Sequence, residues 1–177
     1  MSFIILVFVA VVLVIIFGRT PVTIKGHWKH FYDNTYFPTM DFYEQVQKGL
    51  KDRKIDRISF SKEAFLESHF FSTKRVYLRI DEHEYVFYIC AAPFGTGTFV
   101  SWWLCIKDER LINKIPVISK LLGLDRSRKT FYQMDSEAMY QSMIHTVVVS
   151  VSDELTAANG YRLSELDRQY REISAAK

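Results

Sequence analysis

The first eighteen residues carry no charged side chain, and this run restricts what the chain can fold into more than any other feature. Every residue from Phe3 to Phe17 is apolar, and the uncharged stretch extends to Gly18. As a helix, eighteen residues reach about 27 Å, close to the roughly 30 Å thickness of a bilayer's hydrocarbon core. Strands usually run for only about 4 to 8 residues. The sequence therefore predicts a transmembrane anchor over residues 1–20.

A cleaved secretory signal and a core element are the alternatives to a retained anchor. A signal peptide begins with positive charge and ends in small residues of the A-x-A kind, whereas here Phe-Gly-Arg-Thr follows the run. Arg19, Lys25 and Lys29 come after the run, and only the α-amino group precedes it as a positive charge. The positive-inside tendency therefore places the rest of the chain in the cytoplasm, with the N-terminus outside.

The composition suits one anchor and one folded domain, because the 177 residues are 49% hydrophobic and 24% charged. The net charge is only +3, and basic residues are scattered among acidic ones, so we expect no nucleic-acid partner. Cys90 and Cys105 lie in apolar runs, which favours buried free thiols over a disulfide framework or a metal site. We expect no cofactor.

Turn signals and apolar periodicity predict an α+β domain over residues 41–160. Four strands of an antiparallel meander are expected near 56–65, 74–81, 84–93 and 98–106. The six residues KTFYQM, 129–134, are a candidate fifth strand. Helices are expected over 41–53 and 137–158, and a charged C-terminal helix or tail over 161–177. The fold class is therefore a four- to five-stranded antiparallel sheet packed with two or three helices.

The third and fourth predicted strands are apolar on both faces. One face can be covered by the chain's own helices, whereas the other needs another layer, a partner chain or lipid. Two adjacent tryptophans on opposite faces make one of them a candidate interface anchor, with ordinary core packing as the alternative. The predicted interface residues are Trp102, Trp103, Phe94 and Phe99.

Two segments are candidates for contact with the membrane surface. Residues 21–40 form an aromatic-rich juxtamembrane connector whose rings either collect at headgroup depth or pack onto the domain. Residues 111–129 form a basic amphipathic segment that either lies in the headgroup plane or covers the core. The predicted membrane-interface residues are Arg19, Trp28, Tyr32, Lys114, Lys120, Arg126 and Arg128.

Few residues are arranged for chemistry. His27 and His30 are three apart and could share a helical face with Asp33, although such loose spacing is weak evidence for a metal site. His145 lies beside the apolar stripe of the long helix, which favours a hydrogen-bonded core or interface histidine over a catalytic base. His27, His30 and His145 are therefore the ligand candidates, and the sequence shows no catalytic triad.

These features predict a single-pass membrane protein whose α+β domain is an interaction or assembly subunit of a membrane complex. Its expected partners are the bilayer and either other proteins or further copies of this chain. The alternatives are a membrane-associated enzyme or ligand-binding domain that uses the candidate histidines or a cysteine, and a binder of anionic lipid surfaces through 111–129.

Overall fold

The computed structural model describes residues 22–55, 57–65, 75–107, 130–157, 160 and 162–172. The elements are β1 (Val22–Tyr32), α2 (Thr39–Asp52), β2 (Ser59–Phe65), β3 (Arg75–Glu82), β4 (Tyr85–Phe94), β5 (Gly97–Lys107), α4 (Phe131–Thr156) and β6 (Arg171–Glu172). An antiparallel sheet and two helices are present, so the predicted α+β class is confirmed.

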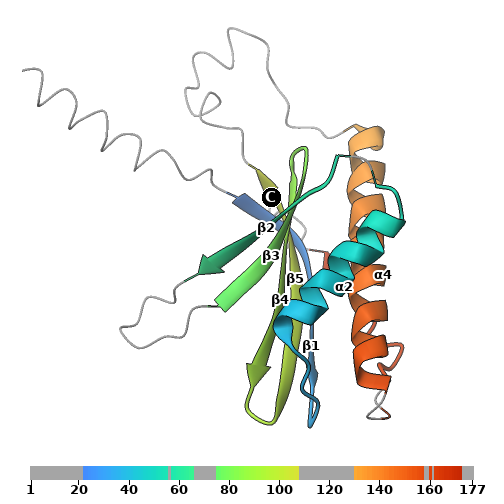
Figure 1. Ribbon diagram of the computed structural model, residues 1–177. Coiled ribbons are helices and arrows are strands. Elements are labelled where there is room, and N and C mark those ends of the chain that lie inside the picture. Colours follow the sequence, from blue (N-terminus) through green and yellow to red (C-terminus); the bar gives the residue numbers. More distant parts are fainter. Residues whose placement is uncertain are drawn as a thin grey trace, which may run out of the picture.

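The sheet has the strand order β2-β3-β4-β5-β1-β6, and every neighbouring pair is antiparallel. The meander from β2 to β5 matches the four predicted strands. Figure 1 shows α2 and α4 on the same side of the sheet, crossing each other. One face of the sheet is therefore covered by the chain's own helices, as expected.

Strand β1 was not predicted, and it corrects the reading of residues 21–40 as a connector. It pairs with β5 along its whole length, from Val22 opposite Lys107 to Tyr32 opposite Thr98. Trp28 and Tyr32 point into the core and are buried, whereas Phe31 points to the other face. Polar residues interrupt the alternation of apolar and polar side chains that predicts a strand. The strand therefore forms through its contacts with β5 and the helices, which lie far away in the sequence.

The core lies between the sheet and the two helices. Helix α2 contributes Phe42, Tyr43, Val46 and Leu50, which confirms the helix expected over 41–53. Helix α4 contributes its own buried row, Ile144, Val147, Val148 and Val151. These side chains pack on Leu78, Ile80, Phe87, Ile89, Trp102 and Leu104 of the sheet.

Helix α4 begins six residues earlier than predicted, so the proposed fifth strand over 129–134 is wrong. Thr130 caps the helix: its side chain accepts a hydrogen bond from the Gln133 backbone N–H at 3.2 Å, and the Gln133 side chain accepts one from the Thr130 N–H at 2.9 Å. This reciprocal capping box outweighs the strand preference of Phe131 and Tyr132.

Where the backbone ladder between β3 and β4 ends, a side chain bridges the two strands. The paired strand residues run from Glu82–Tyr85 to Leu78–Ile89. Beyond them, the hydroxyl of Tyr43 donates to the Val76 carbonyl at 2.7 Å and accepts from the Ala91 N–H at 3.1 Å. Helix α2 thus satisfies the strand groups where the two strands diverge.

The C-terminal segment is held by tertiary contacts rather than by a helix, which corrects the helical prediction for the described part of 161–177. The described residues 162–172 contain a turn and the two-residue strand β6, which pairs with Gly26 and His27 of β1. Leu163 is buried, and the ring of Tyr170 packs on Trp102 and His145. These anchors lie on β5 and α4, outside the reach of local sequence patterns.

Among the helices that the structure describes, none combines the length and the apolar character needed to span a bilayer. The predicted anchor over 1–20 and the segment 111–129 lie outside the described residues.

Candidate functional site

The face of the sheet opposite the helices carries a continuous set of aromatic side chains. We call it the aromatic face and define it by Phe31, Phe65, Tyr77, Tyr88, Phe94, Phe99 and Trp103. No helix or strand among the described residues packs on it (Figure 1). Phe94 is 63% exposed and Phe65 is 45% exposed, while the rings between them are half-buried. Apolar groups of this size are unusual on an open surface.

A row of four side chains crosses the middle of this face: His27, Trp103, Tyr88 and Arg79. The imidazole of His27 stacks on Trp103, with 4.9 Å between ring centroids and 15° between planes. Trp103 lies directly opposite Tyr88 in the β4–β5 ladder. The Arg79 guanidinium then lies 5.8 Å from the centroid of the Tyr88 ring. The stacked imidazole and the guanidinium restrict the positions of the Trp103 and Tyr88 rings.

A small charge network forms one side of the row. Arg79 binds Glu63 and, through Nε at 2.5 Å, Asp81, and Lys107 Nζ lies 2.6 Å from Asp81. Burial alone would raise the pKa of Asp81, but the hydrogen bonds from Arg79 and Lys107 outweigh it and hold the pKa below its usual value. The two cations and two carboxylates balance, so the network adds polarity without net charge.

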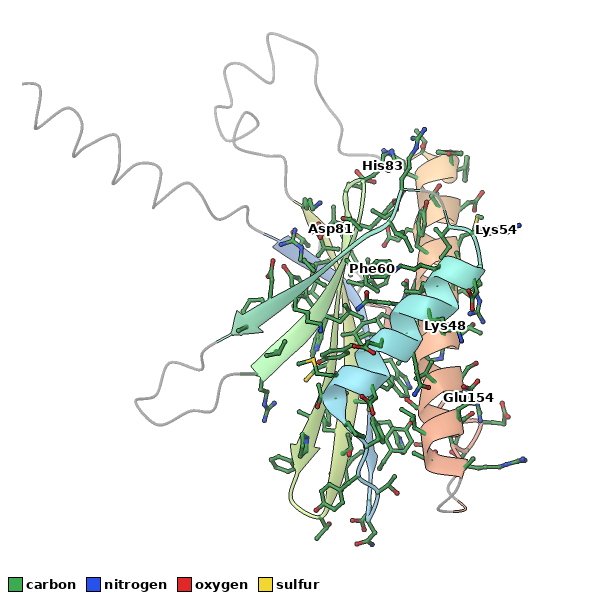
Figure 2. All side chains as sticks on the ribbon, in the orientation of Figure 1. Lys48, Lys54, Phe60, Asp81, His83 and Glu154 are labelled. Atoms are coloured by element: carbon green, nitrogen blue, oxygen red, sulfur yellow. The ribbon has the colours of Figure 1, made fainter. Side chains whose placement is uncertain are left out.

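Charged side chains lie on the helical side of the domain. Figure 2 shows Lys48, Lys54 and Glu154 projecting from the helical side, away from the sheet. Asp81 lies instead toward the end of the sheet where His83 marks the β3–β4 turn (Figure 2).

The predicted interface residues divide between the two faces. Trp103, Phe99 and Phe94 lie on the aromatic face, whereas Trp102 is fully buried under α4 and is not available to a partner. The prediction is therefore wrong for Trp102. Phe31, Phe65, Tyr77 and Tyr88 were missed, although the alternation in β3 already separates Tyr77 from the core positions.

The predicted membrane-interface aromatics are not at a surface. Trp28 is 2% exposed and its indole Nε1 donates to the Asp167 carbonyl at 2.5 Å, and Tyr32 is fully buried. A headgroup collar of these two rings is excluded because both already belong to the core. The remaining candidates of this group, Arg19, Lys114, Lys120, Arg126 and Arg128, lie outside the described residues.

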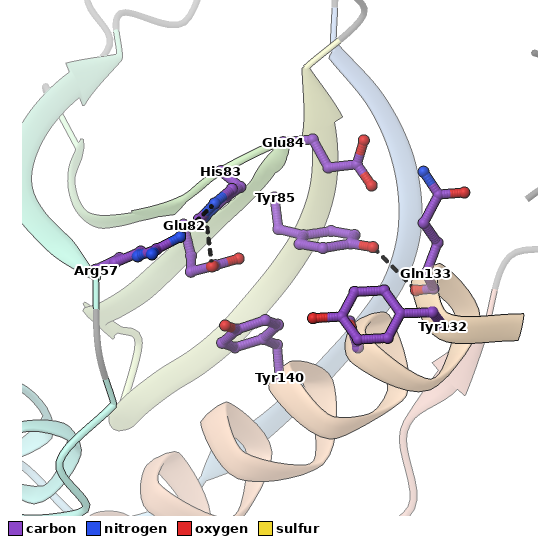
Figure 3. A pocket seen from close by; sticks show the side chains of 9 residues that line it. Arg57, Glu82, His83, Glu84, Tyr85, Tyr132, Gln133 and Tyr140 are labelled. Atoms are coloured by element: carbon purple, nitrogen blue, oxygen red, sulfur yellow. Dashed lines mark hydrogen bonds and ion pairs between the residues drawn. The ribbon is translucent and has the colours of Figure 1, made fainter. Parts of the chain in front are cut away.

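A pocket of about 820 Å³ lies where the β3–β4 hairpin meets the first turns of α4 (Figure 3). The Tyr85 hydroxyl crosses it and donates to the Gln133 carbonyl at 3.0 Å. Tyr140 hydrogen-bonds to Glu82, and burial together with this contact raises the pKa of Tyr140 to about 12. These bonds fasten the hairpin to the helix.

The same pocket contains a glutamate–histidine pair, but its geometry does not suit a general base. Oε1 of the buried Glu82 lies 2.7 Å from Nδ1 of His83, and Nη1 of Arg57 lies 3.3 Å from Nε2. In the neutral histidine, Nδ1 donates to the carboxylate and Nε2 accepts from the guanidinium. Arg57 thus occupies the lone pair that proton abstraction needs. The arrangement clamps the residues before β2 to the hairpin.

The three histidines predicted as ligands are not assembled into one site. His27 and His30 lie on a strand, so their odd spacing places them on opposite faces, and the shared helical face is wrong. His30 Nδ1 lies 3.7 Å from Asp167, and burial lowers the pKa of His30 more than this carboxylate raises it. Within the described residues, no three His, Cys, Asp or Glu side chains are grouped to hold a metal ion.

His145 is a structural histidine. Its Nδ1 accepts a hydrogen bond from Trp102 Nε1 at 3.2 Å, and its Nε2 lies 2.5 Å from the Arg168 carbonyl. Both nitrogens are used in the neutral form, in agreement with the core role expected for it. The ring joins β5, α4 and the C-terminal segment.

The cysteines are free and buried, as predicted. Burial raises the pKa of the Cys105 thiol to about 11 and also raises the pKa of the Cys90 thiol. Both thiols are therefore protonated at neutral pH and are poor nucleophiles.

Comparisons of this chain with protein-family models, with curated protein sequences and with solved structures each gave no match.

Proposed function

We propose that this chain is a single-pass membrane protein whose α+β domain binds another protein subunit through the aromatic face. The single observation that carries the proposal is a sheet with helices on one face and seven aromatic side chains on the other. In this proposal residues 1–20 anchor the chain, with the N-terminus outside and the domain in the cytoplasm.

The composition of the aromatic face supports a protein partner. Protein interfaces are enriched in tyrosine, tryptophan, phenylalanine and arginine at their centre and carry a polar rim. Trp103, Tyr88 and Arg79 form such a centre, and the Glu63–Asp81–Lys107 network borders it. Trp103 is already stacked on His27, and Tyr88 already lies against Arg79, so little side-chain entropy is lost when a partner covers these rings.

The enzyme alternative has less support from the geometry. The base of the glutamate–histidine pair is engaged by Arg57, and both thiols are buried and protonated. The aromatic face, in contrast, is not covered by any helix or strand among the described residues.

Co-purification from the native membrane tests the proposal. Full-length tagged protein is extracted at native expression in mild detergent, and the associated proteins are identified by mass spectrometry. We compare the wild type with Phe65→Ser and Phe94→Ser on the aromatic face, and with Leu166→Ser, a control that is 79% exposed elsewhere.

The expected result is a defined partner, or a second copy, that is lost from both face variants and kept by the control. Circular dichroism and thermal melting establish that all variants are folded. A monodisperse wild-type monomer, or equal retention of the partner by the face variants and the control, contradicts the proposal.

A further inference from the structure

We infer that one end of the domain docks on the bilayer surface, with Phe131, Tyr132 and Met134 at headgroup depth. The inference rests on the proposed membrane anchor and adds to it a lipid contact and an orientation.

The end in question is assembled by a chain of direct contacts. Val22, where β1 begins, pairs with Lys107, where β5 ends. The Lys107 N–H donates to the Glu84 carbonyl at 2.8 Å, and next to Glu84 the Tyr85 hydroxyl donates to Gln133 in the first turn of α4. We call this the entry end of the domain, because the chain enters the sheet there (Figure 1).

The entry end exposes large apolar side chains at the start of α4. Phe131 is 84% exposed and Tyr132 is 81% exposed, the highest values among the large hydrophobic residues described, and Met134 is also exposed. The capping box at Thr130 fixes the first helical turn that presents them. Aromatic rings of this kind collect at the interface between lipid and water.

The length of the connection limits how far this end can lie from the membrane. Four residues, Gly18 to Pro21, separate the apolar run from Val22. Even fully extended, the chain from Phe17 to Val22 reaches about 18 Å. Helix α4 has 26 residues and is about 39 Å long, so its far end is beyond this reach. Of the two ends of the domain, the entry end must therefore face the bilayer.

A second feature converges on the same end. Lys107 and Thr130 are the described residues that flank the basic segment 111–129, for which contact with lipid and cover of the core are both open, and Thr130 directly precedes the exposed rings. Both attachments of that segment to the domain are thus at the entry end. A lipid surface is the occupant that fits the tether and the exposed rings together.

Docking in this way orients the aromatic face. The strands run from the entry end toward the Phe94–Gly97 turn, so the sheet stands away from the bilayer and the aromatic face points sideways. A partner that covers this face then lies beside the domain, at the same membrane.

Site-directed spin labelling of the full chain tests the inference. Cys90 and Cys105 are buried, so a cysteine introduced at the surface is labelled selectively, with the wild type as the background. We compare Tyr132→Cys at the entry end with Glu154→Cys, an exposed position in the last turn of α4, both in phosphatidylcholine nanodiscs. Collision rates are measured with oxygen, which concentrates in lipid, and with a neutral nickel chelate, which stays in water.

We expect the ratio of oxygen to nickel accessibility to be several-fold higher at position 132 than at position 154. Met134→Cys, which removes no aromatic ring, gives the same result if the contact is with lipid. Equal nickel accessibility at positions 132, 134 and 154 overturns the inference. Extraction of the full-length chain by alkaline carbonate overturns both the anchor and the docking, whereas a retained chain with water-exposed labels overturns the docking alone.

Discussion

The indole of Trp102 donates its hydrogen bond to the imidazole of His145, and this contact joins the middle of β5 to α4 across the core. On its other side the same imidazole bonds to the Arg168 carbonyl and so holds the C-terminal segment. Protonation of Nδ1 would oppose two N–H groups, and the Trp102 bond would be lost. The structure therefore makes the stability of the domain depend on a neutral His145.

Acidification is expected to destabilise the domain through this histidine. Burial, the largest cause, and the nearby Arg168 charge lower the pKa of His145 more than its bond to the Arg168 carbonyl raises it. The unfolded chain, with a histidine pKa of about 6.5, then binds more protons than the folded state below that pH. The stability that neutral His145 contributes is fully present above pH about 6.5, and it is lost as the pH decreases toward the lowered pKa.

Thermal melts between pH 5 and 8 check this expectation. His145→Gln should be less stable at pH 8 and should lose less stability on acidification than the wild type. The stability of that variant still depends partly on pH, because the pKa of His30 is also lowered by burial. Leu166→Ser, at an exposed site without a titratable group, serves as the control, and an unchanged pH slope in His145→Gln would refute the assignment.

Removal of a tyrosine hydroxyl should reduce the free energy of unfolding more at the buried Tyr43 than at the exposed Tyr36. Tyr43→Phe leaves the Ala91 N–H and the Val76 carbonyl without their bridge, which costs about 1 to 3 kcal/mol of unfolding free energy. Tyr36→Phe loses a bond to the Gly95 carbonyl at an exposed site and should cost well under 1 kcal/mol. Urea denaturation in mild detergent measures both, and equal losses would contradict the bridging role of Tyr43.

Replacement by alanine should destabilise the domain more at Gly97 than at Gly95, although both glycines lie in the β4–β5 hairpin. A Cβ at Gly97 would lie 2.0 Å from the Tyr32 carbonyl oxygen, so β1 and β5 would have to move apart. Gly97→Ala is expected to cost about 3 kcal/mol or more. At Gly95 the Cβ meets no atom, and the φ of +55° costs only about 1 kcal/mol for alanine. Similar midpoints for the two variants in chemical denaturation would argue against this close approach.

Substitution of the two adjacent tryptophans should affect different properties: stability for Trp102 and partner binding for Trp103. Trp102→Ala removes a fully buried ring and is expected to cost about 3 to 5 kcal/mol of stability. Trp103→Ala truncates a half-buried ring on the aromatic face, so we expect a smaller loss of stability together with reduced co-purification of the partner. Denaturation and co-purification are measured on the same preparations. Full partner retention by a folded Trp103→Ala protein would remove Trp103 from the proposed interface.

The sequence by itself determined the parts of this domain in which local periodicity and burial agree. Strands β2 to β5 and helix α2 were predictable because their alternating or helical apolar patterns are bounded by turn signals. The apolar character of β4 and β5 on both faces also indicated a second surface in need of cover. Cys90 and Cys105 were expected to be buried because their neighbours are apolar.

Only the tertiary structure decided the rest, because it depends on contacts between distant residues. Val22 meets Lys107, so β1 is a strand through a partner far along the chain, and the pleat then separates His27 from His30. The same packing buries Trp28 and Tyr32, which had the composition of a membrane collar. Phe131 and Tyr132 favour a strand by their residue types, yet the Thr130 cap and the Tyr85–Gln133 bond place them on a helix at the end where the chain enters the sheet.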